Sequence, residues 1–338
     1  MTACIAGMGW VTPLGTGLET VWERLERGDK PELASVTNSG TGRCHPCFLV
    51  PPKAVEYLAR NPRLRRSSAI SYYAVAAGLA ALEQAGVAPG SEAAAETAVI
   101  FAISNGGVLY TRRFFEQIVQ HGANGASPML FPETVYNAPA SHLAALLGIN
   151  GASYTLVGDS SVGITALHFA AQLLALGSVA QCVVVGAEEC DWIVCEAYRT
   201  WRFARTPLAE GAAAVVLRRE GQWKLRAHPG APFAKQSGAA AALESVIRDL
   251  DVPRSPHVIV SSANGTFVDR AESGVLDARF PDAARLYPKR TFGEAPGASA
   301  LQQTVLATLA LQHGRGSCAL VPVVGVNHQA SAAWIEAS

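Results

Sequence analysis

The sequence has little charge and no excess of either sign. Only 16% of its 338 residues are charged, and 27 lysine and arginine side chains balance 27 aspartate and glutamate side chains. Surfaces that bind nucleic acid or anionic membranes normally carry an excess of basic residues. We therefore expect neither nucleic acid nor a membrane surface among its partners.

Long apolar runs and a secretory signal pattern are also missing. The longest apolar stretch, residues 164–180, is interrupted by His168, Gln172 and Gly177 and is too short to span a membrane. Such a segment is typical of a helix buried on nearly every side in a large protein. The seven cysteines are scattered along the chain, so we expect reduced thiols and a cytoplasmic location.

Metal ligands at metal spacing are absent as well. Cys44-His45-Pro46-Cys47 resembles half of a zinc site, but no second cysteine pair follows at a suitable distance. We therefore expect no metal.

What the sequence does contain is a regular alternation of apolar strands and helices within a 49% hydrophobic chain. Expected strands cover residues 2–9, 96–103, 154–158, 182–186, 211–219, 257–261 and 319–324. Expected helices cover residues 18–27, 67–85, 109–120, 137–147, 162–176, 239–250 and 298–313. Residues 28–66 look like surface loops. Apolar strands that alternate with helices predict an α/β fold whose sheets are covered on both faces.

Seven segments, in this order along the chain, carry a resemblance to a known family. They are residues 5–15, 137–143, 154–163, 185–188, 210–212, 262–266 and 289–297. Together they resemble the β-ketoacyl-acyl-carrier-protein synthases, the ketosynthase family of the thiolase superfamily. The resemblance implies a thiolase-like five-layer αβαβα fold made of two similar halves. We place the halves at residues 1–220 and 221–338, with their junction within residues 221–238.

The resemblance also implies partners and a substrate. Members of the family form dimers, contain an acyl-chain tunnel and receive a thioester on the phosphopantetheine arm of an acyl carrier protein. That arm would enter as substrate, and no bound cofactor is expected.

The nucleophile position of the family is altered in this chain. Ser160 stands where the family has a cysteine at the start of a buried helix, whose dipole stabilises a thiolate. An alcohol is much harder to ionise, so Ser160 would need a general base within hydrogen-bond reach. Ser160 is either a surviving acyl acceptor or a residue that fills the space of the cysteine and caps the helix.

The two histidine positions of the family are also altered, to Asn264 and Glu294. An ionised Glu294 would repel the enolate that the family's histidines stabilise, although it could instead serve as a base for Ser160. Lys289 remains and would pair with Glu294 if the intervening loop turns them together. His328 lies where the family has a glycine-rich loop, and it is either structural or a substitute for a lost histidine. The Arg-Pro-Phe-Asp type segment that precedes the family's Glu-Gly pair is missing.

Four arginines, Arg60, Arg63, Arg65 and Arg66, form a basic cluster before an expected helix. They are either a solvated face or, chiefly Arg63, Arg65 and Arg66, a docking surface for an acidic acyl carrier protein.

These changes leave enzymatic activity open between three hypotheses. The first is a non-condensing partner of an active ketosynthase, comparable to a chain length factor, in a bacterial type II fatty-acid or polyketide system. The second is a serine-dependent acyltransferase, synthase or thioesterase that acts through Ser160. The third is a carrier-binding or regulatory homodimer without chemistry.

Overall fold

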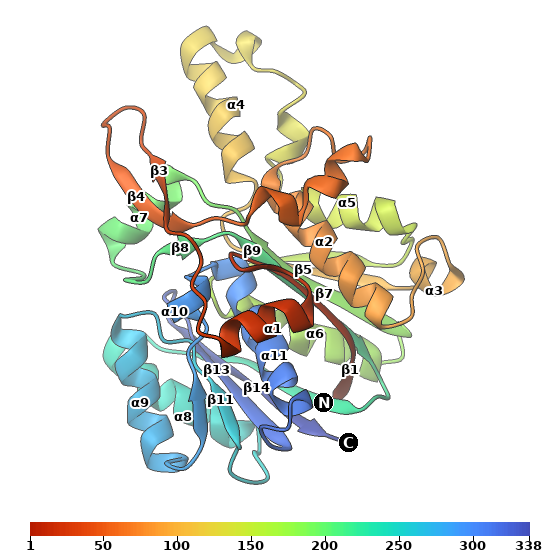
Figure 1. Cartoon of the computed structure of the whole chain (residues 1–338), viewed down its shortest axis with the longest axis vertical. Coiled ribbons are helices and arrows are strands. Elements are labelled where there is room, and N and C mark those ends of the chain that lie inside the picture. The colour runs from red at the N-terminus through yellow and green to blue at the C-terminus, as the bar shows by residue number, and fades with distance from the viewer.

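A computed structural model describes residues 1–338, and its central feature is a sheet of eleven strands (Figure 1). One leaf of this sheet contains, in spatial order, β1 (Ala3–Thr12), β9 (Gly211–Arg218), β7 (Gln181–Glu188), β5 (Ala98–Ile103) and β6 (Ser153–Val157). The other leaf contains β10 (Trp223–Pro232), β14 (Gln329–Ala337), β13 (Cys318–Val324), β11 (Val258–Val260) and β12 (Ala284–Leu286). The strand β2 (Gly15–Thr16) pairs with β1 outside this path.

The two leaves have the same topology. When the five strands of each leaf are numbered along the chain, both leaves have the order 1-5-4-2-3. A long apolar helix joins the third strand of each leaf to the fourth: α6 (Val162–Ala175) in the first leaf and α11 (Pro296–Gln312), after the short α10 (Lys289–Phe292), in the second. The expectation of two similar halves is thereby confirmed.

The helices form three layers around the two leaves. The outer face of the first leaf packs against α2 (Ala69–Gln84) and α5 (Ala138–Leu147), and that of the second against α8 (Ala239–Asp249) and α9 (Phe267–Arg279). Between the leaves, α6 packs against α11, of which every residue except Gln312 is buried. A Cβ atom on Gly163 would lie 2.9 Å from that of Ala300, so glycine permits this close packing. The layers follow the expected αβαβα order.

The junction between the leaves is itself made of strand. Residues Ala3, Cys4 and Ile5 of β1 pair with Leu225, Lys224 and Trp223 of β10, which lies within the expected junction at residues 221–238. The proposed division after residue 220 falls in the turn between β9 and β10, and this boundary stays a prediction. No helix is long and apolar enough to cross a membrane.

The largest departure from expectation lies in residues 28–66, which are not only loops. They contain β3 (Ala34–Thr37) and β4 (Cys44–Phe48), which form a small sheet with β8 (Leu208–Ala209), and two short helices, η1 (Pro52–Ala54) and η2 (Glu56–Arg60). The loop prediction was wrong because β4 pairs with a strand about 160 residues further along the chain, through Cys47 and Leu208. Such long-range pairing leaves little local signal in the sequence.

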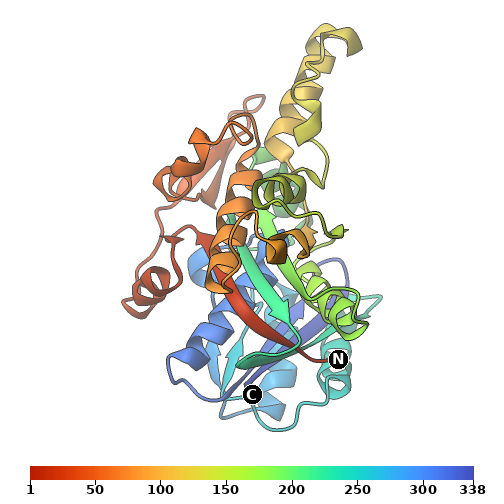
Figure 2. The ribbon, with the colours of Figure 1, turned by 90° about the vertical axis from the view of Figure 1, so that its right-hand side faces the viewer.

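The remaining elements complete the chain. They are α1 (Leu18–Glu26), α3 (Glu92–Ala95), α4 (Val108–His121), η3 (Ala123–Gly125), η4 (Phe131–Glu133), α7 (Trp192–Trp201) and η5 (Gln236–Gly238). In both views α4 projects away from the layered body (Figures 1 and 2).

Candidate functional site

Four of the residues singled out in the sequence lie together in the interior. Ser160 precedes α6, Asn264 lies in the loop between β11 and α9, Lys289 begins α10, and Glu294 lies between α10 and α11. Their exposed fractions are only 4%, 2%, 2% and 1%, respectively. The loops that follow several strands of both leaves thus meet at one buried site.

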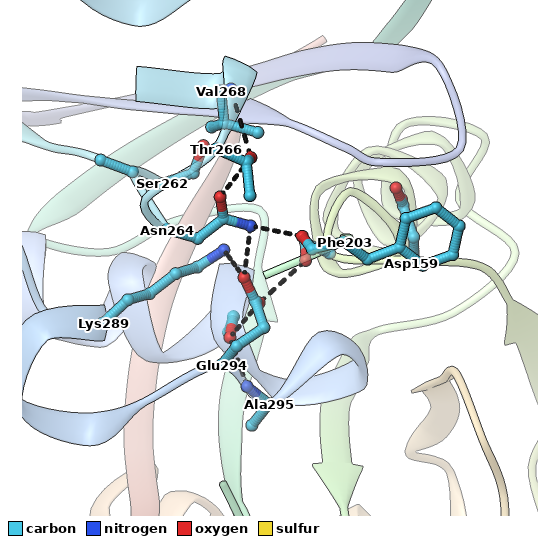
Figure 3. Close-up of polar contacts among 12 residues, drawn as sticks. Asp159, Phe203, Ser262, Asn264, Thr266, Val268, Lys289, Glu294 and Ala295 are labelled. Carbon is cyan, nitrogen blue, oxygen red and sulfur yellow. Dashed lines mark hydrogen bonds and ion pairs between the residues drawn. The ribbon is translucent and has the colours of Figure 1, made fainter. Parts of the chain in front are cut away.

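Glu294 is the centre of this site, and each of its carboxylate oxygens accepts two hydrogen bonds. The Oε1 atom accepts from the hydroxyls of Ser160 at 3.0 Å and Ser299 at 3.2 Å. The Oε2 atom accepts from Nζ of Lys289 at 2.8 Å and Nδ2 of Asn264 at 3.0 Å (Figure 3). The expected Lys289–Glu294 ion pair is therefore present, and a buried carboxylate with four donors and a counter-charge is well satisfied.

Asn264 is held by contacts on both ends of its amide. Its Nδ2 atom donates to the backbone oxygen of Phe203 at 3.0 Å as well as to Glu294, and its Oδ1 atom accepts from Oγ1 of Thr266 at 2.6 Å (Figure 3). Because an amide nitrogen has two hydrogens, both are used within the protein. In this arrangement Asn264 has no hydrogen left for an acyl oxygen.

Of the two alternatives for Ser160, the one in which it caps the buried helix does not hold. The N-cap residue of α6 is Ser161, and the Ser160 hydroxyl donates to Glu294. Asp159 organises this turn by accepting the backbone N–H of Ser161 at 3.0 Å and its hydroxyl at 2.8 Å. Sequence reasoning missed Asp159, although it directly precedes the nucleophile position.

Asp159 also holds the loop between β13 and β14, where the resemblance places the glycine-rich loop of the family. Its Oδ2 atom accepts the backbone N–H of Asn327 at 2.9 Å. A Cβ atom on Gly325 would lie 2.1 Å from the same oxygen, so only glycine allows this approach. Asp159 therefore ties the turn before α6 to the loop between β13 and β14.

His328 does not join the network around Glu294. Its backbone lies in the left-handed region with φ of 71°, and its ring stacks on Phe233 with centroids 5.2 Å apart. No hydrogen bond connects it to Ser160, Asn264 or Glu294. The contacts that His328 does make are structural.

The loop that follows α7 closes over the site with its backbone. Phe203 contributes its carbonyl oxygen to Asn264, and Arg205 donates its N–H to the backbone oxygen of Asn264 at 2.9 Å. Pro207 accepts the N–H of Glu294 at 2.9 Å. Side-chain patterns gave no signal for these contacts, because backbone groups make them. None of the five principal cavities is lined by Ser160, Asn264, Lys289 or Glu294.

Two further buried acids anchor the start of helices near the site. Glu188 accepts the N–H of Gly297 in α11 at 2.9 Å, and Glu189 accepts the N–H of Leu109 in α4 at 2.8 Å and that of Ile70 in α2 at 3.0 Å. Burial raises the pKa of Glu188 to about 8 and that of Glu189 to about 7, against the opposing effect of these N–H donors.

Comparisons with known proteins agree with this fold. Residues 56–222 match the family described as "Beta-ketoacyl synthase, N-terminal domain". The chain is 24% identical to 3-oxoacyl-[acyl-carrier-protein] synthase 2 of Vibrio cholerae, over 73% of this chain and 69% of that protein. It is 26% identical to a putative polyketide beta-ketoacyl synthase 2 of Streptomyces halstedii, over 92% of this chain and 85% of that protein.

Solved structures share the fold over the whole chain. The ishigamide ketosynthase/chain length factor has a TM-score of 0.83 at 20% identity, covering 100% of this chain and 99% of that one. The ketosynthase in complex with its chain length factor from Xenorhabdus doucetiae has a TM-score of 0.79 at 17% identity, covering 99% and 98%. The fold is therefore that of the thiolase-like condensing proteins. The chain is thus similar to β-ketoacyl synthases, and residues 56–222 match the N-terminal domain of that family.

The buried ion pair leads to a stability prediction. Replacing Glu294 with alanine leaves the Lys289 ammonium buried without a counter-charge, and we expect the free energy of unfolding to fall by about 3–5 kcal/mol. The double variant Lys289→Met, Glu294→Leu removes both charges and should recover most of this loss. Urea unfolding of the three proteins measures the difference. Equal instability of the single and double variants would contradict an ion-pair role.

The raised pKa of Glu188 predicts how stability changes with pH. Because its pKa in the folded protein, about 8, exceeds its ordinary value of 4.5, the folded state binds the proton more tightly than the unfolded state. The resulting stabilisation is complete below pH about 4.5 and is lost as the pH rises through about 8.

In the Glu188→Gln variant this side chain cannot titrate. The part of the pH dependence of the unfolding free energy that comes from Glu188 should therefore vanish. In wild type the slope contributed by one such group approaches about 1.4 kcal/mol per pH unit at its steepest. Urea unfolding between pH 5 and pH 8.5 measures it, with exposed Glu244→Gln as the matched control. An unchanged slope in Glu188→Gln would show that Glu188 is already ionised at neutral pH.

Proposed function

We propose that this chain is a non-condensing, chain-length-factor-like partner of an active ketosynthase in a bacterial type II fatty-acid or polyketide system. The observation that carries the proposal is the buried Glu294 carboxylate, which binds Ser160, Asn264 and Lys289, the residues that the resemblance assigns to the condensing site. The residues that would be needed for bond-making are engaged with one another.

Condensation requires a nucleophile and donors for a developing enolate, and this site opposes both needs. To accept a proton from Ser160, Glu294 would have to become neutral beside the Lys289 ammonium, which would break the buried ion pair. A negative carboxylate next to an enolate oxygen would raise the energy of the transition state instead of lowering it. The geometry therefore favours support of a partner's chemistry.

An unpaired sheet edge supports pairing with a second subunit. The strand β6 is the last of its leaf and pairs only with β5, and its Tyr154 and Val157 side chains are 39% and 56% exposed. On the projecting α4, Phe115 and Val119 are 59% and 84% exposed. Exposed strand edges and apolar side chains of this kind are typically covered by another protein.

The arginine cluster supports docking of an acyl carrier protein. Arg63, Arg65 and Arg66 are exposed between η2 and α2, and none of them makes an ion pair within the chain. Leu64, between them, is fully buried, and its backbone oxygen accepts the hydroxyl of Tyr72 at 2.7 Å. Fixed, unpaired positive charges of this kind attract an acidic partner.

A second candidate, serine-dependent acyl transfer, is favoured by one distance. The Ser160 hydroxyl lies 3.0 Å from Glu294 Oε1, which is within reach for a general base. In that case Ser160 would take the acyl group from a carrier-bound thioester, forming a serine ester and releasing the carrier thiol. No ketosynthase partner would be needed. The two candidates differ in which protein holds the acyl group.

Co-expression with the cysteine-bearing ketosynthase of the same pathway tests the proposal. We expect the two chains to purify as a heterodimer whose condensing rate changes by no more than about twofold with Ser160→Ala, because the chemistry lies in the partner. Replacing the nucleophile cysteine of the ketosynthase should abolish the activity. An acyl adduct on this chain alone, detected by intact mass and absent in Ser160→Ala, would instead establish serine acyl transfer.

Charge reversal tests the docking surface. The triple variant Arg63→Glu, Arg65→Glu, Arg66→Glu should weaken association with the acyl carrier protein by about tenfold or more at low salt, and the difference should shrink as salt increases. The variant Arg254→Glu, Arg270→Glu, Arg279→Glu changes the net charge equally at exposed sites in the second half. Equal loss of binding in both variants would show that only overall charge matters.

A further inference from the structure

Three cysteines lie together outside the site described above. Cys47 is in β4, Cys190 is the second residue after β7, and Cys195 is the fourth residue of α7. The Sγ atoms of Cys190 and Cys195 are 3.5 Å apart, and both residues are buried, with exposed fractions of 4% and 6%. Neither thiol contributes to the network around Glu294, so the proposed function gives them no role.

One of these thiols is reachable from a small cavity. Cys195 lines a cavity of about 210 Å³ together with Tyr198 and the loop residues Arg205 and Thr206. The cavity has room for a few water-sized molecules. Thr206 is part of the cavity wall, and its buried Oγ1 atom has no hydrogen-bond partner within the protein.

We propose that Cys190 and Cys195 are a reversible dithiol that hydroperoxides oxidise through this cavity. The Cys195 sulfur attacks the O–O bond, forming a sulfenic acid and releasing water, or an alcohol from an organic hydroperoxide. The Cys190 thiol then displaces the sulfenic hydroxyl, so that an S–S bond forms and a second molecule, water, leaves. Two thiols thereby supply the two electrons that reduce the peroxide, and a small thiol reverses the step.

The surroundings assign the order of the two thiols. Cys195 lines the cavity and meets the oxidant first, whereas Cys190 lies behind it against Cys47. Contacts with the thiols of Cys195 and Cys47, together with burial, raise the pKa of Cys190, which disfavours it as the first thiol to attack peroxide. Cys190 is therefore the resolving thiol.

Disulfide formation would act on the start of α7. The sulfur atoms must close from 3.5 Å to about 2.05 Å, which draws in the segment that contains Asp191. Asp191 caps α7 by accepting the N–H of Ile193 at 3.0 Å, and it also accepts Nε of Arg112 in α4 at 2.9 Å. Oxidation would thus shift the anchor that α7 and α4 share.

Peptide mapping of the whole protein tests the proposal. A Cys44→Ser background removes the exposed thiol, and the reduced protein is treated with a few equivalents of hydrogen peroxide and then alkylated. Cleavage on the N-terminal side of Asp191 separates Cys190 from Cys195, so a disulfide joins peptides 159–190 and 191–248. We expect this linked pair, and we expect dithiothreitol to release it.

Three variants make the assignment specific. Cys190→Ser and Cys195→Ser should each abolish the linked pair, and Cys182→Ser should retain it although Cys182 shares the peptide 159–190. In Cys190→Ser, Cys195 should stop at the sulfenic acid, which dimedone traps. A link between Cys47 and Cys190, or peroxide treatment that leaves both thiols alkylatable, would overturn the proposal.

A measurement on the unmutated protein guards against misfolded variants. Phenylarsine oxide bridges two thiols that lie within a few ångströms, so the reduced protein should bind one arsenical per chain, and prior peroxide treatment should prevent this. Failure to bind the arsenical in the reduced state would also contradict the proposal. These outcomes do not depend on whether a ketosynthase partner binds.

Discussion

The buried carboxylate of Glu294 is the interaction on which the rest of the site depends. Taking a charge out of water is costly, and it is tolerated here because Lys289 neutralises the charge and three neutral donors complete its hydrogen bonds. These partners come from both halves of the chain: Ser160 from the first half, and Asn264, Lys289 and Ser299 from the second. The network therefore fixes the approach of the two halves to one another.

The backbone contributes as much to this closure as the side chains do. The loop after α7 presents the Phe203 oxygen to Asn264 and the Pro207 oxygen to the N–H of Glu294. These contacts place the loop directly over Asn264 and Glu294, so that backbone and side-chain groups satisfy one another at this site.

The sequence predicted the layered fold because its elements follow simple local rules. Apolar strands such as β5 and β7 and the helices α6 and α11 are buried on nearly all sides, and this is visible in their composition. That Ser160, Asn264 and Glu294 meet was expected only from the family resemblance, since about 100 residues separate the first two. The role of Asp159 and the stacking of His328 on Phe233 depend on loop conformation, which local sequence patterns do not encode.

The C-terminal end of β7 connects this closed site to the surface proposed for a partner. Adjacent residues of one segment, Glu188 and Glu189, bind the N-terminus of α11 directly behind Glu294 and the N-terminus of the projecting α4. Both acids are buried and adjacent in the chain. A displacement of α4 would therefore disturb the hydrogen bond of Glu189 to α4, which lies next to the hydrogen bond of Glu188 to Gly297. A subunit that binds α4 would therefore stabilise the geometry around Glu294. The interior polar network and the projecting helix are thus linked through two neighbouring buried acids.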